Sequence, residues 1–457
     1  MKRSIERMLW IFTLVTIIGI FYIVPQARPF KNENEFSYYD NLFKTSLQYL
    51  KDYYVDSDKT DIKDLYYGAI QGMYKASGDA YTTLLEPKML QGLMESIQGE
   101  FEGIGAYVGV KDSRIVIISP IEGTPAYKAG VRPGDLIMKI NDKDTENMKL
   151  EEAVSLLRGP ADSKVKVSFY RKGVLQPIDI ELKRKKIEIP SIRETMLANK
   201  IGYIKIINFG EKTTEELEKA LDNLSGQGMK KLIIDLRYNP GGALNAVVDM
   251  ADLFLDKGLV VYTVGKDSSE TKKFFSSDNT SINTKVPMAV LINGGSASAS
   301  EILAGALKDR KRAVVVGEKS YGKGTVQNVF KILDKDEMLG LKITIAKYYT
   351  PGGYVIDKNG IEPDIKVDMP KMEPEEELAS IKILEGKYIE KFVDKNKKKI
   401  PDADFKALKK ELASKNLIVK DLFLKKLIRS EQSYLEGPQI IDLEYDTQLQ
   451  KAIEVLK

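Results

Sequence analysis

The feature that most constrains this chain is a run of small residues, Gly294–Ile302, between an apolar segment and a helical pattern. The apolar segment, Val286–Ile292, predicts a buried strand, and residues Ala299–Leu307 predict a helix. In a strand, turn and helix of this order, the first backbone N–H groups of the helix point outward and can hold a developing negative charge. Ser298 in this turn is therefore a candidate nucleophile.

The same turn also has an ordinary structural explanation. Ser298 and Glu301 fit the S-x-x-E pattern of a capping box, in which the serine only satisfies backbone donors. Ser296 and Ser300 are rival nucleophiles by local sequence. The turn alone leaves a helix cap and a catalytic serine both open, and a catalytic serine needs a base from elsewhere in the chain.

Composition limits which base could serve this serine. The chain has no histidine and no cysteine, which excludes a Ser-His-Asp triad, a thiol nucleophile, disulfides and zinc held by those side chains. A lysine, a carboxylate or a terminal amine remains. Lys323 is the strongest candidate because two flanking glycines allow close backbone approach, which can bury its amine and favour the neutral form. Gln327 could orient that amine by a hydrogen bond.

The N-terminus has the pattern of an export or membrane segment. Three basic residues precede an apolar run, Met8–Pro25, that is close to the shortest length able to span a bilayer. No A-x-A cleavage site follows, so we expect an uncleaved anchor over residues 1–30; a cleaved signal peptide and a buried helix are the alternatives. The positive charges put the N-terminus in the cytoplasm and the rest of the chain outside the cell membrane.

Residues 31–98 predict a helical N-terminal arm, broken at Ser77–Asp79. This segment is too short to hold much core by itself. It is either a helical hairpin that packs on a neighbouring part of the chain or a dimerisation arm, and we expect a homodimer.

Residues 99–185 change to short β-rich runs. The expected strands are Ala106–Val110, Arg114–Ile118, Leu136–Ile140 and Lys164–Tyr170, with one helix at Met148–Leu157. Two glycines near residue 104 would by themselves only shape a turn. Together with the segment Ala129–Ile137 (AGVRPGDLI) they resemble a bacterial PDZ domain. The resemblance implies a groove for a peptide C-terminus, with the carboxylate held near Gly103, Ile104, Gly105 and Ala106.

Residues 186–370 alternate strands and helices, which predicts an α/β core with helices packed on a sheet. The expected strands are Ile201–Asn208, Lys231–Leu236, Val286–Asn293 and Ala313–Gly317, and the expected helices are Thr213–Leu224 and Ala243–Phe254. A second glycine turn, Asp235–Gly242 (DLRYNPGG), precedes the latter helix.

Residues 371–457 are charged and predict a helical C-terminal region. Its charge run, Lys395–Lys399, fits a solvated helix end or loop, with contact to anionic lipid as the alternative. The net charge of the whole chain is only +4, and basic residues are mixed with acidic ones, so we expect no nucleic-acid partner.

Four motifs together resemble the signatures of the carboxyl-terminal processing (tail-specific) proteases. In chain order they are DLRYNPGG, GGSASASEI, GEKSYGKGTVQ and YYTPGGYVIDKNGIEPDI. The resemblance runs from about residue 38 to residue 370, with a weaker echo in Asp446–Lys457. It implies a serine endopeptidase with a Ser-Lys dyad, an inserted PDZ domain and no metal or organic cofactor.

Matched by position, the resemblance implies that Ser298 is the nucleophile, Lys323 the base and Gln327 its support. It implies oxyanion donors at the Ala299 N–H and at Gly241.

Two further residues match less central family positions. Asp309 matches an acidic residue that matters in some members, and Arg158 matches a PDZ arginine that couples peptide binding to activation. The chain departs from the family pattern at Ala80, where relatives commonly have proline.

The expected protein is a membrane-tethered extracytoplasmic serine endopeptidase that recognises unstructured, apolar C-termini through its PDZ domain. Two rival functions stay open. One is a peptide-binding scaffold whose protease domain is inactive, and the other is an acyl-transfer enzyme that acts on thioesters.

Overall fold

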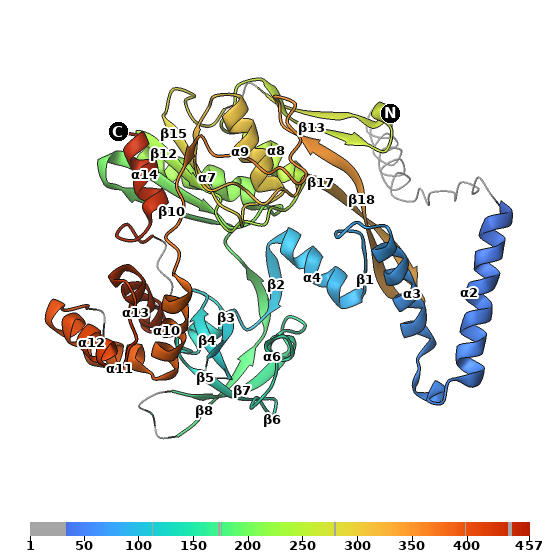
Figure 1. Ribbon diagram of the computed structural model, residues 1–457, viewed down its shortest axis with the longest axis horizontal. Helices are drawn as coiled ribbons and strands as arrows, with labels where there is room; N and C mark the ends of the chain where they lie inside the picture. Colours follow the sequence, from blue (N-terminus) through green and yellow to red (C-terminus); the bar gives the residue numbers. More distant parts are fainter. Residues whose placement is uncertain are drawn as a thin grey trace, which may run out of the picture. The chain divides into compact units, whose positions relative to one another are not determined.

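Figure 1 shows the computed structural model of the chain. It describes residues 33–111, 113–171, 174, 176–277, 280–397, 399–436 and 441–457. The chain divides into two compact units, Met1–Gly78 and Asp79–Lys457. The membrane anchor expected at residues 1–30 lies outside the described residues. Within those ranges, no helix combines the length and the apolar character that crossing a bilayer requires.

The described part of the first unit consists of the helices α2 (Glu33–Tyr53) and α3 (Ile62–Ala76), joined through the short 3-10 helix η1 (Ser57–Lys59). Asp61 caps α3 because its side chain accepts a hydrogen bond from the Lys63 N–H at 2.7 Å. Several large apolar side chains stay exposed along these helices: Phe36, Tyr39, Leu42, Tyr53 and Met73. This unit therefore leaves much of its apolar surface in contact with solvent.

Within the range expected to be a helical arm, residues 83–85 instead form a short strand. The second unit contains this strand, β1 (Thr83–Leu85), and the helix α4 (Pro87–Gln98). Leu84 and Leu85 are buried, and β1 pairs with a strand of the protease region. Three residues are too few to produce a recognisable strand pattern, which explains the difference.

A six-stranded antiparallel sheet carries the first half of the second unit, in the order β3-β4-β5-β7-β8 with β6 on β5. Its strands are β3 (Ala106–Lys111), β4 (Arg114–Pro120), β5 (Leu136–Ile140), β6 (Lys143–Asp144), β7 (Lys164–Tyr170) and β8 (Ile178–Lys183). The helices α5 (Pro125–Lys128) and α6 (Leu150–Leu157) complete it. Ile115, Ile117 and Phe169 lie in its core. The four strands expected here are confirmed.

A two-stranded ribbon, β2 (Glu100–Gly103) with β9 (Lys185–Glu188), joins this β domain to the α/β core. The core holds a six-stranded sheet in the order β10-β11-β12-β15-β16-β19. The strands are β10 (Ile192–Leu197), β11 (Ile201–Ile206), β12 (Lys231–Asp235), β15 (Met288–Ile292), β16 (Val314–Gly317) and β19 (Ile365–Lys366). Pairing is parallel from β11 onward. The expected core strands are confirmed to within two residues.

Helices cover both faces of this sheet. The helices α7 (Thr213–Gly226), α8 (Leu244–Asp252) and α9 (Ala299–Asp309) share one core with alternate strand residues such as Ile204 and Ile234. The last helix, α14 (Thr447–Val455), packs with the residues in between, such as Tyr203 and Ile233. Since successive strand side chains point to opposite faces, α14 lies on the face opposite to α9.

A second sheet flanks the first, in the order β1-β18-β13-β14 with β17 paired to β18. Its other strands are β13 (Gly258–Gly265), β14 (Lys272–Ser276), β17 (Thr325–Asp334) and β18 (Glu337–Tyr349). The segment Glu318–Gly324, called the lysine loop below because it contains Lys323, leads from β16 into β17 of this sheet.

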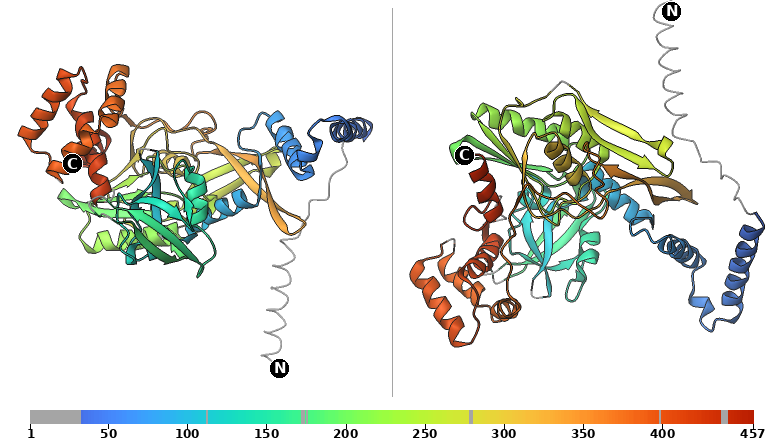
Figure 2. Two further views of the ribbon diagram at one scale, coloured as in Figure 1. Left: turned by 90° about the horizontal axis from the view of Figure 1, so that it is seen from below. Right: turned by 45° about the horizontal axis from the view of Figure 1, so that its top comes forward.

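Four helices form a separate cluster before α14: α10 (Pro374–Glu385), α11 (Tyr388–Asn396), α12 (Asp402–Ser414) and α13 (Asp421–Glu436). They have their own core, which includes Ile383, Leu424 and Ile428, and they group together in Figures 1 and 2. Lys395 lies at the end of α11 and pairs with Asp404 at 2.7 Å.

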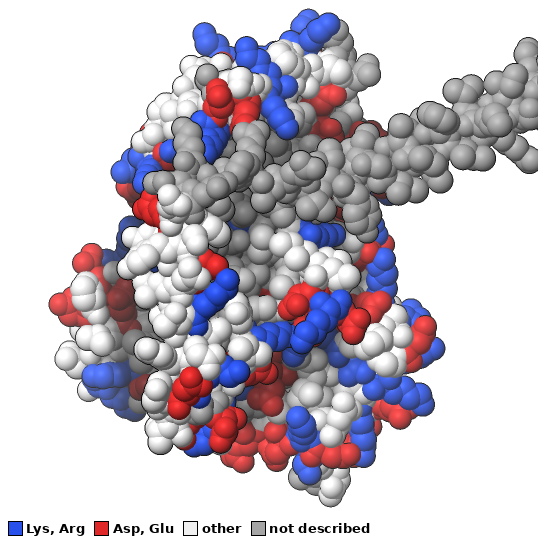
Figure 3. All heavy atoms as spheres, turned by 90° about the vertical axis from the view of Figure 1, so that its right-hand side faces the viewer, with Lys and Arg blue, Asp and Glu red and all other residues white. Residues whose placement is uncertain are grey.

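On the face that Figure 3 shows, basic and acidic side chains are interspersed.

Candidate active site

The segment Asn293–Ser298, called the serine turn below, joins the buried strand β15 to α9. After Ile292, the Asn293 side chain accepts hydrogen bonds from the N–H groups of Gly295 and Tyr238, each at 3.0 Å, and these close the turn. Ser298 then has φ 56° and ψ −114°, a conformation that L residues rarely adopt, and α9 begins at the next residue. Strain of this kind costs about 1–3 kcal/mol and clusters at functional sites.

The hydroxyl groups of the two rival serines are engaged inside the structure. Ser296 Oγ donates to the Leu236 carbonyl oxygen at 2.8 Å, and Ser300 Oγ donates to the Asn239 carbonyl oxygen at 2.9 Å. Both serines are completely buried, whereas Ser298 is 8% exposed. Of the three, Ser298 is therefore the one that solvent reaches.

Glu301, in the first turn of α9, is the centre of hydrogen bonding at this site. Its Oε2 accepts from the N–H groups of Ser298 at 2.8 Å and of Lys323 at 2.9 Å. Its Oε1 accepts from the Gly322 N–H and the Ser320 hydroxyl, both at 2.6 Å. Burial raises the pKa of Glu301, and these four hydrogen bonds oppose the rise. One buried carboxylate thus holds the serine turn and the lysine loop together.

Lys323 lies in the loop after β16, and its neighbours half-bury it. A Cβ added to Gly324 would come within 1.9 Å of the Asp357 backbone nitrogen, so only glycine fits there. Burial is the main cause that lowers the pKa of Lys323; the charge of Lys342 lowers it further, and Glu301 opposes both. The lowered pKa agrees in direction with the expected effect of the glycine surroundings, and the role of Lys323 as base stays a prediction.

Two side chains border the lysine loop. The Lys323 amine lies 5.0 Å from the ring centre of Tyr81, which covers it on that side. The pKa of Tyr81 is raised to about 12, mainly by burial and then by its hydrogen-bonded neighbour Tyr321. Gln327, on β17, directs its amide donor to Thr325 Oγ1 at 2.8 Å and to Thr344 Oγ1 at 3.4 Å. The expected contact of Gln327 with the amine stays a prediction.

The DLRYNPGG loop forms a wall behind the serine. Gly241 has φ 101°, and an added Cβ would lie 2.7 Å from Ser298 Cβ and 2.9 Å from the Ala299 nitrogen. Only glycine therefore allows this close approach. The Gly241 N–H, however, donates to Asn239 Oδ1 at 2.9 Å. Gly241 could serve as an oxyanion donor only if Asn239 released that hydrogen bond, whereas the Ala299 N–H lies at the start of α9 as expected.

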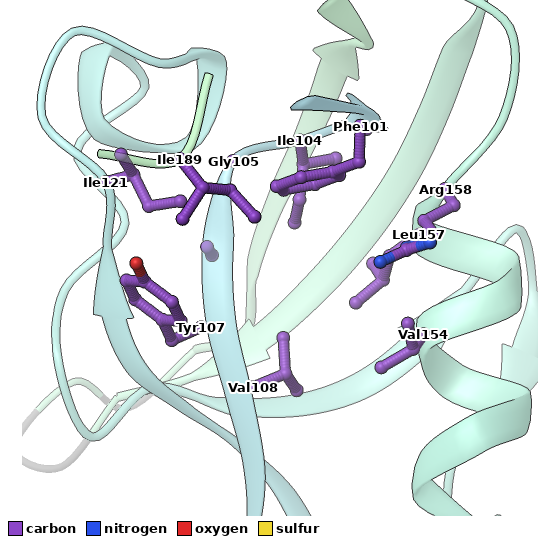
Figure 4. Close-up of a pocket in the computed structure, with 12 residues that line it drawn as sticks. Phe101, Ile104, Gly105, Tyr107, Val108, Ile121, Val154, Leu157, Arg158 and Ile189 are labelled. Atoms are coloured by element: carbon purple, nitrogen blue, oxygen red, sulfur yellow. The ribbon is translucent and has the colours of Figure 1, made fainter. Parts of the chain in front are cut away.

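The β domain carries an apolar groove between β3 and α6, with a cavity of about 180 Å³. Its lining includes the predicted residues Gly103, Ile104, Gly105, Ala106 and Arg158, together with Val108, Val154 and Leu157 (Figure 4). Gly105 has φ 77°, and an added Cβ would lie 2.3 Å from Thr124 Cβ, so the turn requires glycine. At the rim, Arg158 pairs with Glu95 of α4 at 2.5 Å.

Comparisons with known proteins agree with this arrangement. A family model described as Peptidase family S41 matches residues 200–367, and a PDZ domain model matches residues 116–171. The chain is 37% identical to the carboxy-terminal processing protease CtpA of Bacillus subtilis (strain 168) over 437 residues, which cover 92% of this chain and 91% of that protein. The chain belongs to the carboxy-terminal processing proteases of peptidase family S41.

Other members of this protease family are also similar. The carboxy-terminal-processing protease of Bartonella bacilliformis is 36% identical over 363 residues, which cover 78% of this chain and 82% of that protein. Among solved structures, the photosystem II D1 C-terminal processing protease is 32% identical to this chain. The match covers 71% of this chain and 86% of that protease, with a TM-score of 0.43. The family and the enzyme class predicted from the four motifs are confirmed: this is an S41 serine protease with a PDZ domain.

Asp309 of this S41 protease does not join the site. It ends α9, roughly 15 Å along the helix from Ser298. Its Oδ2 accepts a hydrogen bond from the Gly352 N–H at 2.7 Å. Asp309 therefore fixes the TPGG turn to the end of the helix. Within the described ranges, no group of three or more acidic side chains is arranged to hold a metal ion.

Sequence reasoning assigned Glu301 only a capping role and missed its contact with the lysine loop. A signal was present, because Ala299–Leu307 otherwise consists of small and apolar residues that are all buried. A carboxylate in such a segment needs internal partners. The contact between Tyr81 and Lys323 gave no comparable signal, since the two residues are far apart in the sequence.

Proposed function

We propose that this S41 protease is anchored in the cell membrane, faces outward, and hydrolyses peptide bonds of proteins with unstructured, apolar C-termini. Ser298 acts as the nucleophile and Lys323 as the general base. One observation carries this assignment: the N–H groups of Ser298 and Lys323 share Oε2 of Glu301 as their acceptor. The shared acceptor keeps the backbone of both residues in one small region, as a Ser-Lys dyad requires.

The proposed reaction starts with the neutral Lys323 amine, whose fraction rises because burial lowers the pKa of Lys323. The amine takes the Ser298 hydroxyl proton as Oγ attacks the scissile carbonyl carbon, and the Ala299 N–H stabilises the oxyanion. The Lys323 ammonium then protonates the leaving amine. A water molecule that the same amine deprotonates hydrolyses the acyl-enzyme. Gln327 supports the lysine in these steps.

Substrate recognition is assigned to the PDZ groove. The C-terminal carboxylate would bind backbone N–H groups of Gly103–Ala106, and the last side chain would pack against Val108 and Leu157. The groove is lined mainly by apolar side chains, which favours an apolar last residue. Arg158 lies at the rim beside Glu95, so a bound peptide could exchange that ion pair for a contact with its own carboxylate.

The membrane location and a homodimeric state complete the proposal. The apolar run Met8–Pro25 and the basic residues before it support an anchor with the protease outside the membrane. The exposed aromatic and aliphatic side chains of α2 and α3 support a dimerisation surface, because patches of this kind mark protein contacts.

A cleavage assay with the full chain in detergent tests the dyad. The substrate is an unfolded protein that ends in apolar residues. Ser298→Ala and Lys323→Ala should each abolish turnover, while the affinity of the groove for a peptide, measured by fluorescence anisotropy, stays unchanged. Lys319→Ala is the matched control, because Lys319 lies in the same loop but is half exposed and pairs with Glu362.

Proteolysis above background in both dyad variants would overturn the assignment. Wild-type protein that binds the peptide but cuts neither this substrate nor a panel of unfolded proteins would instead indicate a peptide-binding scaffold. Hydrolysis of thioesters without peptide cleavage would indicate an acyl-transfer enzyme.

A further inference from the structure

A buried charge cluster lies at the end of strand β12, beside the DLRYNPGG loop. Asp235 is completely buried, and Arg237 is 7% exposed. The Arg237 guanidinium donates to Asp235 Oδ2 at 2.6 Å and to Asp235 Oδ1 at 3.0 Å, and the Tyr203 hydroxyl donates to Asp235 Oδ2 at 2.7 Å. The orientation of Arg237 is therefore fixed on the side of the sheet.

The other side of the guanidinium is held by the last segment of the chain. Arg237 Nη1 and Nη2 donate to the two carboxylate oxygens of Asp446 at 2.7 and 2.6 Å, a bidentate pair. Nη1 also donates to Gln448 Oε1 at 3.1 Å. More than two hundred positions of sequence separate Arg237 from these partners, so the contact exists only in the folded protein.

The segment that supplies these acceptors is itself firmly attached. Asp446 caps α14, since its Oδ1 also accepts from the Leu449 N–H at 2.9 Å. Gln448 Nε2 donates to the Val367 carbonyl oxygen at 2.8 Å. Leu449 and Ala452 are completely buried against the sheet, on the face opposite to α9. The helix is thus a rigid support for Arg237.

The DLRYNPGG loop, Asp235–Gly242, contains Arg237 and is hydrogen-bonded to the serine turn. Its Leu236 and Asn239 carbonyl oxygens accept from the hydroxyls of Ser296 and Ser300, and the Asn239 carbonyl also accepts from the Ala297 N–H at 3.0 Å. Gly241 at its end touches Ser298, as described above. A shift of Arg237 would therefore be transmitted to the backbone around the nucleophile.

We propose that the C-terminal segment Ile441–Lys457 positions the catalytic turn. Asp446 and Gln448 hold Arg237, and Arg237 holds the loop that backs Ser298. Asp446 and Gln448 are positioning residues, because they act on Ser298 only through Arg237 and its loop. A buried ion pair can often be replaced by apolar residues without loss of stability. The Arg237–Asp446 pair is therefore assigned a role in holding the position of the loop behind Ser298. A displacement of about 1 Å at a reacting group costs on the order of a hundredfold in rate. This inference rests on the proposed dyad.

Asp446→Asn in the full chain tests the proposal. Asparagine caps helices as well as aspartate does, so α14 keeps its start while Arg237 loses one of its two charged partners and keeps Asp235. We expect kcat to fall roughly ten- to a hundredfold, whereas KM and the affinity of the PDZ groove for a peptide stay within twofold. Gln448→Met, which keeps the side-chain volume, should lower kcat by a smaller factor.

Ile453→Ala is the matched control, because Ile453 packs α14 against the sheet with an apolar side chain that makes none of the hydrogen bonds of the charge cluster. It should lower the melting temperature and leave kcat unchanged well below that temperature. Equal kcat values for Asp446→Asn and Ile453→Ala, per folded molecule, would overturn the proposal. So would a change in KM at constant kcat. If Asp446→Asn does not fold, Gln448→Met alone decides by the same comparison.

Ser298→Ala in the same assay separates this inference from the proposed function. Residual activity of the Ser298→Ala variant would contradict the assignment of the dyad. An inactive Ser298→Ala variant together with a fully active Asp446→Asn variant would contradict only the role of the C-terminal segment.

Discussion

Two completely buried carboxylates, Asp235 and Glu301, lie in the segments that meet at Ser298, and their surroundings are opposite in kind. Asp235 faces a guanidinium, whereas Glu301 faces the four neutral donors of the serine turn and the lysine loop. Burial alone would raise the pKa of Asp235, but the hydrogen bonds and charge of Arg237 outweigh it and lower that pKa. For Glu301 burial dominates, and the pKa rises.

The difference indicates two ways of using a buried acid. The Asp235 pair is a charge-compensated clamp, and its protonation state is fixed across the physiological range. Glu301 has no cationic group among its hydrogen-bond donors. It instead accepts hydrogen bonds from the serine turn and the lysine loop and so holds these two segments together. Its charge also acts on Lys323, whose pKa it raises. We therefore expect changes at Asp235 to affect stability first, and changes at Glu301 to affect catalysis first.

Arg237→Met should have the largest effect on stability. It leaves Asp235 buried without its cation, and breaking a buried ion pair in this way costs about 3–5 kcal/mol. Denaturant unfolding, followed by a probe in the protease core, measures the loss. The control is the double variant Asp235→Asn/Arg237→Met, which should recover part of the stability because the completely buried charge of Asp235 is gone, while Asp446 still lacks its cation. A double variant as unstable as the single one would show that shape, not charge, dominates this clamp.

Outside the dyad itself, Glu301→Gln should have the largest effect on catalysis. Each Glu301 oxygen accepts two hydrogen bonds, and an amide group would turn one of these acceptors into a donor that faces other donors. We expect kcat to fall on the order of a hundredfold, because the serine turn and the lysine loop separate. Peptide affinity of the PDZ groove should not change.

Glu318→Gln is the matched control for that variant, since Glu318 begins the lysine loop that Glu301 contacts but itself accepts from the Met369 N–H. It should retain wild-type kcat. A Glu301→Gln variant that is unfolded rather than inactive would contradict the distinction between the two carboxylates.

The sequence predicted the parts of this molecule that depend on local pattern. The core strands are continuous apolar runs, and the glycines beside Lys323 lie where backbone segments approach closely, with the lysine half-buried. The motifs also identified the protease family. Contacts between distant segments were not predictable, because no pattern in one segment specifies its partner. The Arg237–Asp446 pair and the contact of Tyr81 with Lys323 are of this kind. Gly241 shows a third case, in which the motif found the residue but not the hydrogen bond to Asn239.

Tyr203→Phe should have a moderate effect on stability and none on kcat. The substitution removes only the hydroxyl that donates to Asp235. A hydrogen bond to a charged group contributes about 1.5–3 kcal/mol, and Arg237 still compensates the carboxylate. Denaturant unfolding and turnover on the same preparation measure both quantities. Loss of kcat at an unchanged folded fraction would mean that the catalytic turn depends on the Tyr203–Asp235 hydrogen bond as well as on the contact of Arg237 with the C-terminal segment.

Lys342→Gln should have the smallest effect, a shift of the pH profile. The positive charge of Lys342 lowers the pKa of Lys323, after burial, so its removal lets that pKa rise. Because the neutral amine acts as the base, the rising limb of kcat/KM should move to higher pH, and the rate at neutral pH should fall. Lys347→Gln, on the same strand but paired with Asp357, should not move it. Glu301 raises the pKa of Lys323, so the residual activity of Glu301→Gln should show the limb moved to lower pH. Shifts of both variants in one direction would mean that burial alone, and not the balance of these two charges, sets the pKa of the lysine.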